Sequence, residues 1–180
     1  MADEKNRPEI AQLVAEHHQA AYRYAYRLTG SVHDAEDLTQ QVFLVAQQKL
    51  GDLRKIENAK AWLFAILRNC FLKSVQRRQP VLAIDLPLTM ELVEESGDAE
   101  EVDRDRVQQA LDRLPEASRV VLVMFYFEDC SYREIAERLE MPIGTVMSRL
   151  ARAKGFLRSV LLEPDRGHGK RPSAVTSERR

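Results

Sequence analysis

The chain has 180 residues, 44% of them apolar and 31% charged, which is enough for one ordinary domain or two small ones. No apolar run approaches 18 residues, and residues 1–7 are polar, so we expect no membrane insertion, no secretory signal and a cytoplasmic protein. The net charge of −1 conceals a segregation, because residues 81–106 carry nine acidic against two basic side chains whereas residues 1–80 are net +3. Basic surfaces that suit nucleic acid can therefore coexist with an acidic segment.

The apolar residues recur mostly at helical spacing and the chain has only 7 Gly, so the sequence predicts an all-α fold. A first helix is expected over residues 9–28, with Gly30 just after it. A second is expected over residues 31–50, capped by its first residue, and a third over residues 58–78. Together these helices predict a first domain over residues 8–79.

The segment after the third helix differs in composition. Residues 80–106 contain two prolines and many acidic side chains, which predicts a flexible acidic linker. A second helical domain is expected over residues 107–163. Residues 164–180 are rich in Pro, Gly, Ser and Arg and predict a disordered basic tail. The expected architecture is two small helical domains joined by a flexible acidic linker.

A helix-turn-helix is predicted within the second domain. Ser131 and Glu134 can form a capping box at the start of its first helix, and Pro142 stands where the second helix would begin. One face of the second helix is apolar and is expected to point to the core: Val146, Leu150, Ala153 and Leu157. The other face carries small polar and basic side chains that suit the DNA major groove: Thr145, Ser148, Arg149 and Arg152. The alternative is an ordinary helical hairpin whose arginines are merely solvated.

Residues 114–127 predict a strongly apolar helix that Pro115 opens. Four of its side chains are expected to bury against the helix-turn-helix: Val121, Leu122, Phe125 and Tyr126. Four others provide apolar surface beyond what this packing covers: Val120, Val123, Met124 and Phe127. The interpretation that we favour is burial within a compact helical unit, and the alternative is a docking face for a protein partner.

Two segments of the first domain combine a core face with a polar face. Residues 34–43 place Leu38 and Val42 on a core stripe and turn acidic and amide side chains outward. Residues 62–71 contain a regular core stripe: Trp62, Leu63, Ile66, Leu67, Cys70 and Phe71. The opposite face is expected to expose an aromatic ring among basic and amide groups, which suits unstacked bases and phosphates: Phe64, Arg68, Asn69, Lys73, Gln76 and Arg77.

Taken together, these segments resemble the extracytoplasmic-function sigma factors of the sigma-70 superfamily. Four motifs occur in the family's order and at its separations: residues 34–43, 61–69, 114–116 and 142–153. The resemblance implies a sigma factor, not an enzyme, that binds RNA polymerase core and directs transcription initiation at promoters by recognising minus-10 and minus-35 elements. It implies no metal and no other cofactor, and an anti-sigma factor is expected as a further partner.

The resemblance assigns residues to three surfaces. The core-binding surface, which packs on the clamp helices of the beta-prime subunit, comprises Asp34, Glu36, Asp37, Gln40, Gln41 and Phe43. Within it, Phe43 holds the helix in its fold. The minus-10 surface comprises Phe64, Arg68, Asn69, Lys73, Arg77 and Arg78, with Asn69 contacting a flipped base. The minus-35 surface comprises Gly144, Thr145, Ser148, Arg149, Arg152 and Lys154. The first helical part of the second domain is expected to contact the polymerase beta flap.

Three residues depart from the family's usual pattern. Lys73 stands where Asp is frequent, and Met147 stands where Lys or Arg is common, so both bear on promoter preference. Glu140 replaces a frequent turn glycine. If its backbone is left-handed, this residue costs on the order of 1 kcal/mol.

Other classes of protein explain less of the sequence. A helix-turn-helix transcriptional regulator that acts without core polymerase is the main alternative, but it has no use for the segments at residues 34–43 and 62–69. An adaptor with only protein partners does not need the arginines of the reading helix. An enzyme is the weakest alternative, because we find no catalytic arrangement, no phosphate-binding glycine loop and no metal-ligand spacing. Cys70 and Cys130 are expected to be free thiols.

Overall fold

The computed structural model describes residues 9–53, 56–78 and 104–162. Within these ranges the chain is helical and contains no strand, so the expected all-α fold is confirmed. The helices are α1 (Ile10–Thr29), α2 (Val32–Gln48), α3 (Ala59–Arg78), α4 (Arg104–Asp112), α5 (Glu116–Phe127), α6 (Tyr132–Arg138) and α7 (Ile143–Leu162), with short 3-10 turns at Leu50–Asp52 and Ile56–Asn58. The predicted tail, the polar N-terminal residues and most of the predicted linker lie outside the described residues.

Local signals set the helix ends of the N-terminal bundle, α1 to α3. Gly30 adopts a φ of 69° and ends α1, with its N–H donating to the carbonyl of Tyr26 at 2.9 Å. The hydroxyl of Ser31 accepts from the backbone N–H of Asp34 at 3.3 Å and caps α2. The predicted core stripe of α3 is buried at four of its six positions and half-buried at the first and fifth: Trp62, Leu63, Ile66, Leu67, Cys70 and Phe71.

The C-terminal unit, α4 to α7, contains the predicted helix-turn-helix as α6 and α7. Both halves of the capping box form between Ser131 and Glu134, and α7 begins directly after Pro142. The predicted core face of α7 is buried at its first three positions and half-buried at the last: Val146, Leu150, Ala153 and Leu157. Between the two helices Glu140 has a φ of 52°, in the left-handed region that glycine prefers. α4 begins at Arg104, so the helical unit starts slightly earlier than expected.

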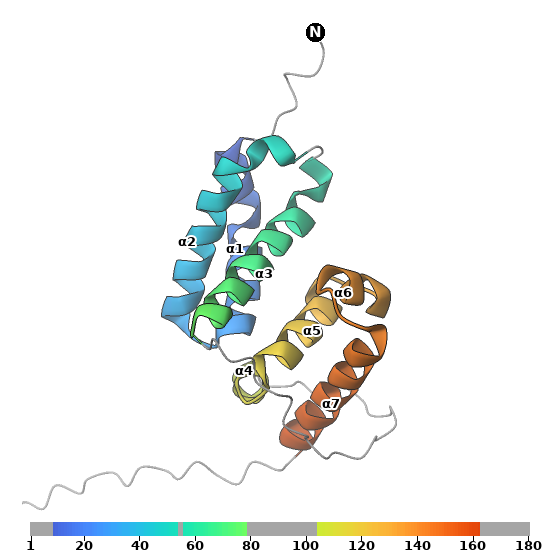
Figure 1. Ribbon diagram of the computed structural model, residues 1–180. Helices are drawn as coiled ribbons and strands as arrows, with labels where there is room; N and C mark the ends of the chain where they lie inside the picture. The colour runs from blue at the N-terminus through green and yellow to red at the C-terminus, as the bar shows by residue number, and fades with distance from the viewer. Residues whose placement is uncertain (1–8, 54–55, 79–103, 163–180) are drawn as a thin grey trace, which may run out of the picture.

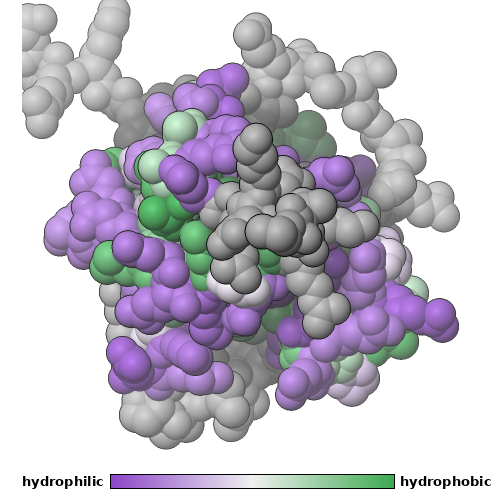
Figure 2. Space-filling model, turned by 90° about the horizontal axis from the view of Figure 1, so that it is seen from above, coloured by the Kyte–Doolittle hydropathy of each residue, from purple (hydrophilic) through white to green (hydrophobic). Residues whose placement is uncertain are grey.

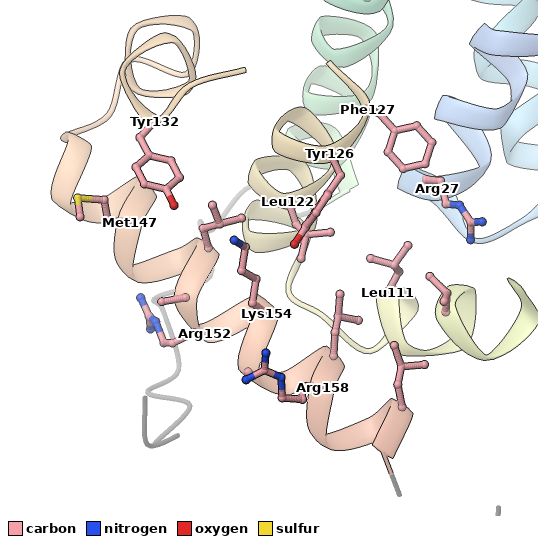
Figure 3. Close-up of a pocket in the computed structure, with 16 residues that line it drawn as sticks. Arg27, Leu111, Leu122, Tyr126, Phe127, Tyr132, Met147, Arg152, Lys154 and Arg158 are labelled. Carbon is pink, nitrogen blue, oxygen red and sulfur yellow. The ribbon is translucent and has the colours of Figure 1, made fainter. Parts of the chain in front are cut away.

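Helix α5 is buried on two sides, because it packs against α1 of the bundle and against α7 of its own unit. The favoured expectation for Val120, Val123 and Met124, burial within a compact unit, is confirmed. The expectation for Tyr126 was wrong, since this ring is 55% exposed. Tyr126 lies on the side of α5 that faces a groove instead of a neighbouring helix (Figure 3).

The two helical units pack against each other, with α1 on one side and α4 and α5 on the other. Figure 1 shows α5 lying between the bundle and α7, and the larger of two clusters of buried apolar residues includes members of both units, while the smaller comprises Leu13, Leu53 and Ala59. Polar contacts cross the same boundary, because Arg119 donates to the carbonyl of Leu28 at 2.7 Å and Gln108 to that of Tyr26 at 3.2 Å. We refer to this packing of the two units as the closed arrangement.

The outer surface is mainly polar at the end of the molecule where α1 begins. Seen from this end, hydrophilic residues predominate and hydrophobic ones form small separate patches (Figure 2). Among the described residues, no helix is long and apolar enough to cross a membrane.

Candidate functional site

The outward face of α2 gathers most of the residues assigned to polymerase binding. Four of them are exposed: Glu36, Asp37, Gln40 and Gln41. Asp34 is half-buried in the first turn of the helix. Two apolar side chains, Val32 and Leu44, are also exposed on α2, and Val32 was not singled out from the sequence. The face therefore offers carboxylates and amides together with exposed aliphatic groups, which is a composition that suits a protein interface.

Phe43 is buried and does not present its ring to a partner in this structure. Its ring stacks on that of His18 of α1, with centroids 6.1 Å apart and an interplanar angle of 13°. Phe43 thus fixes α2 to α1 from the inside, in agreement with the expectation that it holds the helix in its fold. Phe43 therefore belongs to the core of the bundle in this structure and not to the exposed contact face of α2.

The expectation that Phe64 and Arg68 lie on an exposed face of α3 was wrong, because each is only 4% exposed. The ring of Phe64 lies 4.6 Å from that of Tyr24, centroid to centroid, while Arg68 forms an ion pair with Glu128 at 2.7 Å. Glu128 follows the last residue of α5. In the closed arrangement the end of α5 therefore pairs with Arg68, whereas the ring of Phe64 packs on Tyr24 of its own bundle.

Glu128 is the centre of a polar cluster that the sequence did not predict. Its carboxylate, with a side chain 3% exposed, accepts from the hydroxyl of Tyr24 at 2.6 Å and from Nη1 of Arg68 at 2.7 and 3.0 Å. It also accepts from Nη1 of Arg138 of α6 at 3.1 Å. We refer to Tyr24, Arg68, Glu128 and Arg138 as the Glu128 cluster. No local sequence pattern links Arg68 to a carboxylate 60 residues away, so periodicity could not reveal it.

The cluster also fixes the protonation of its neighbours. Burial, to which the Glu128 carboxylate adds, raises the pKa of Tyr24 well above its usual value, so this phenol remains a proton donor. Burial likewise raises the pKa of the Cys130 thiol, with Glu128 acting in the same direction. Cys130 and Cys70 are both free cysteines, as expected. A thiol with a raised pKa is a weak nucleophile at neutral pH, so neither residue has the properties of a reactive cysteine.

The remaining residues of the predicted minus-10 surface lie on the outside of α3. Asn69, Lys73 and Arg77 are exposed and follow one another along the second half of the helix. The side chain of Arg78 lies outside the described residues. The structure thus separates the predicted surface into an exposed part at the end of α3 and a covered part near Phe64 and Arg68.

The outer face of α7 brings together most of the residues assigned to minus-35 recognition. Gly144 and Ser148 are exposed, and Thr145, Arg149 and Arg152 are half-buried. Arg152 donates from Nε to the carbonyl of Ser148 at 3.2 Å, which holds the guanidinium near the helix surface. Met147 is exposed as well, so an uncharged side chain occupies the position where the family commonly has Lys or Arg.

Lys154 does not share this face and instead points toward α5. Its Nζ lies 4.6 Å from the ring centroid of Phe125 and 5.7 Å from that of Tyr126, within cation–π range. Figure 3 shows Lys154 directed at Tyr126 across a groove of about 640 Å³ between α4, α5 and α7. The groove has an apolar floor that includes Leu111 and Leu122, and basic residues also line it: Arg27, Arg152, Lys154 and Arg158.

The described residues contain no group of three or more His, Cys, Asp or Glu side chains that could hold a metal ion. The surfaces above differ instead in charge and hydropathy. The α2 face is acidic and amide-rich, the ends of α3 and α7 carry basic and small polar groups, and the groove is apolar with basic residues around it. Surfaces of this composition suit contacts with macromolecules.

Comparison with known proteins matches both helical units. The family model of Sigma-70 region 2 matches residues 13–81, and that of Sigma-70, region 4 matches residues 104–157. The chain is 36% identical over 165 residues to the ECF RNA polymerase sigma factor SigE of Mycolicibacterium smegmatis (strain ATCC 700084 / mc(2)155), which covers 88% of this chain and 64% of that relative. It is 36% identical over 166 residues to the ECF RNA polymerase sigma factor SigL of Mycobacterium tuberculosis (strain ATCC 25618 / H37Rv), which covers 84% of this chain and 88% of the relative.

A solved structure is similar in fold. The chain is similar to the sigma factor RpoE from Bartonella quintana, solved in complex with the anti-sigma factor NepR, with a TM-score of 0.62 at 26% identity. The similarity covers 84% of this chain and 95% of that one. Because the matches extend over both helical units, this chain belongs to the extracytoplasmic-function RNA polymerase sigma factors of the sigma-70 family.

Proposed function

We propose that this chain binds RNA polymerase core through α2 and directs the polymerase to promoters with a minus-10 and a minus-35 element. The observation that carries the proposal is the exposed face of α2, where Asp37, Gln40 and Gln41 are presented on a helix that Phe43 fixes from below. A regulator that needs only duplex DNA has no use for such a face. Initiation takes place in the cytoplasm, where the polymerase core is found.

The minus-35 element is read by α7. A helix of this length enters the major groove of DNA with its N-terminal half, where Gly144 permits close approach and Ser148 is exposed to donate to phosphates or bases. Arg149 and Arg152 supply positive charge along the same half of the helix. Phosphate contacts of this kind fix the register of the helix, while contacts to base edges specify the sequence.

The minus-10 element is bound as a single strand by α3. Asn69, Lys73 and Arg77 are exposed along one part of the helix, so an amide and two cations are available to a flipped base and its neighbouring phosphates. Arg68 joins this surface only after the closed arrangement opens, since it is buried and paired with Glu128 of the other unit, whereas Phe64 is buried against Tyr24 of its own bundle. The energy for flipping a base, a few kcal/mol, is supplied by stacking and phosphate contacts.

The groove between α4, α5 and α7 suits an apolar helical segment with acidic flanks. Its apolar floor and surrounding cations support the polymerase beta flap as the partner of this unit. An anti-sigma factor is a further expected partner, because the similar RpoE was solved in complex with NepR.

Run-off transcription with purified polymerase core tests the proposal. Promoter templates are first selected from a random library by the reconstituted holoenzyme. The double substitution Asp37→Asn/Gln41→Ala is expected to lower core affinity by about tenfold or more, because both side chains lie on the exposed face of α2. The matched control is Gln19→Ala, since Gln19 is exposed on α1 and outside this face. A chain that binds duplex DNA alone and yields no transcript with core would instead be a helix-turn-helix regulator.

A further inference from the structure

The Glu128 cluster is the one place in the described interface where fully buried charges from both units meet. Arg68 comes from α3 of the bundle, Glu128 from the end of α5, and their side chains are 5% and 3% exposed. Tyr24 of α1 adds a hydroxyl donor from the bundle, and Arg138 of α6 adds a second cation from the C-terminal unit. Donors from three helices therefore converge on one carboxylate.

A buried ion pair of this kind makes the packing of the units sensitive to a single side chain. Removing one partner leaves the other charge buried without compensation, which is far more destabilising than the net value of the intact pair. Without Glu128, Arg68 could regain a full set of polar partners only by returning to water or by meeting another anion. The closed arrangement is therefore sensitive to Glu128 in a way that an apolar interface would not be.

One donor of Arg68 remains unpaired in the closed arrangement. Nε of Arg68 is buried and has no hydrogen-bond partner among the described residues. A buried donor that stays unpaired costs free energy, so the closed arrangement does not use all the binding capacity of this guanidinium. Both hydrogen bonds from Arg68 to Glu128 leave from Nη1. A phosphate group can accept from two nitrogens of an Arg side chain at once, and in solvent the remaining N–H groups bond with water. A DNA phosphate can therefore use more donors of this guanidinium than Glu128 uses.

The α2 face, unlike Arg68 of α3, stays exposed in the closed arrangement. Asp37, Gln40 and Gln41 remain exposed while Phe64 and Arg68 are covered. The 25 residues 79–103 that join the two units can span up to about 80 Å when extended, so chain length does not prevent the units from separating. The chain can therefore bind polymerase through α2 before the covered Arg68 of α3 becomes available to DNA.

We infer that Glu128 is an internal competitor of DNA that holds the free chain closed and withholds Arg68 from the single strand until the units separate. The consequence for DNA rests on the proposed function, whereas the effect of Glu128 on closure does not. The other described polar contacts across the boundary, from Arg119 and Gln108 to backbone carbonyls of α1 and from Arg27 to the Gln108 side chain, engage no residue of the predicted minus-10 surface. Among the described polar contacts between the units, those of Glu128 are therefore the ones that link closure to DNA binding.

The test compares Glu128→Gln with Glu137→Gln in the full chain without polymerase. Glu137 is exposed on α6, so the control makes the same chemical change and the same change in net charge outside the cluster. Small-angle X-ray scattering gives the radius of gyration, and fluorescence anisotropy gives the affinity for a labelled pool of short random single-stranded DNA. Glu128→Gln is expected to enlarge the radius and to raise the affinity by roughly tenfold or more, because the buried pair is lost. Glu137→Gln is expected to behave as the parent chain.

Two further variants keep the test decisive. Tyr24→Phe removes one hydroxyl donor from the cluster and is expected to shift both measurements in the same direction by a smaller factor. If circular dichroism shows that Glu128→Gln is unfolded, Tyr24→Phe decides alone. Arg68→Gln is expected to open the chain without the gain in DNA affinity, because it removes the group that Glu128 withholds.

The outcomes are distinct for closure and for the proposed function. A folded Glu128→Gln chain with the radius and the DNA affinity of the parent overturns the inference, as does an equal gain in affinity for Arg68→Gln. Run-off transcription by the parent chain with core is measured separately. Its absence would refute the proposed function, and the radius of gyration would still report whether Glu128 holds the units together.

Discussion

Replacing Gly30 with alanine perturbs two features of the closed arrangement at once. Gly30 has a φ of 69°, in the left-handed region where an L side chain costs about 1 kcal/mol or more. Part of this cost is offset because alanine lowers the entropy of the unfolded chain. A Cβ at this position would also overlap the carboxylate of Asp112, which belongs to α4 of the other unit. The substitution therefore reports on backbone strain and on the contact between the units.

The backbone strain at Gly30 and the displacement of the Asp112 carboxylate contribute separately to the loss of stability. The Asp112 carboxylate accepts from Nε2 of Gln108 at 2.9 Å, and moving it aside loses a hydrogen bond worth about 1 kcal/mol. Its ion pair with Arg119 is long, at 3.8 Å, and Asp112 is partly exposed, so that loss adds little. We expect Gly30→Ala to lower the free energy of unfolding by roughly 2 kcal/mol, half from the backbone and half from the displaced carboxylate.

Urea denaturation of four chains measures this coupling: the parent, Gly30→Ala, Asp112→Ala and the double variant. In the Asp112→Ala background the cost of the alanine is expected to fall to about 1 kcal/mol, because only the backbone contribution remains. Gly51→Ala is the control, since a Cβ at Gly51 meets nothing within 4 Å and the change should be nearly neutral. If Gly30→Ala still lowered the free energy of unfolding by about 2 kcal/mol in the Asp112→Ala background, the two units would not meet at Gly30 in solution.

Three further substitutions test other features of the C-terminal unit. Glu140→Gly is expected to raise the free energy of unfolding by about 0.5–1 kcal/mol in urea denaturation, because glycine adopts the observed φ of 52° without strain; a loss of stability would contradict this. Ser131→Ala removes the N-cap of α6 and is expected to cost about 1 kcal/mol at neutral pH. The backbone and side-chain hydrogen bonds from Ser131 lower the pKa of Glu134, so the stability from this carboxylate is present above its unfolded-state pKa and is lost as the pH falls through the lower folded-state value. The variant should therefore lose less stability on acidification than the parent, and equal pH profiles would argue against the linkage. Met147→Arg adds a cation to the exposed face of α7, and the affinity of the chain for duplex DNA should rise with a salt dependence steeper by about one ion, whereas an unchanged slope would place this residue away from phosphates.

Local structure could be predicted because its causes lie within a few residues of one another. Gly30 ends α1, and Ser131 with Glu134 starts α6, through hydrogen bonds that join residues three or four apart. The apolar spacing on α7 predicted its core face for the same reason, since the helix period alone decides which side chains share a side. The left-handed turn at Glu140 was predicted conditionally and is present.

The sequence by itself determined most of the helices, the ends set by Gly30, Ser31 and Ser131, the core faces of α3 and α7, and that the chain carries the motifs of a sigma factor. Only the tertiary structure decided which polar sides stay open. Arg68 on α3 pairs with the end of α5, Phe64 packs on Tyr24 of α1, and Lys154 points to α5 instead of outward. The physical reason is that helical periodicity fixes the direction of a side chain relative to its own helix, whereas burial depends on what packs against that helix from elsewhere in the chain.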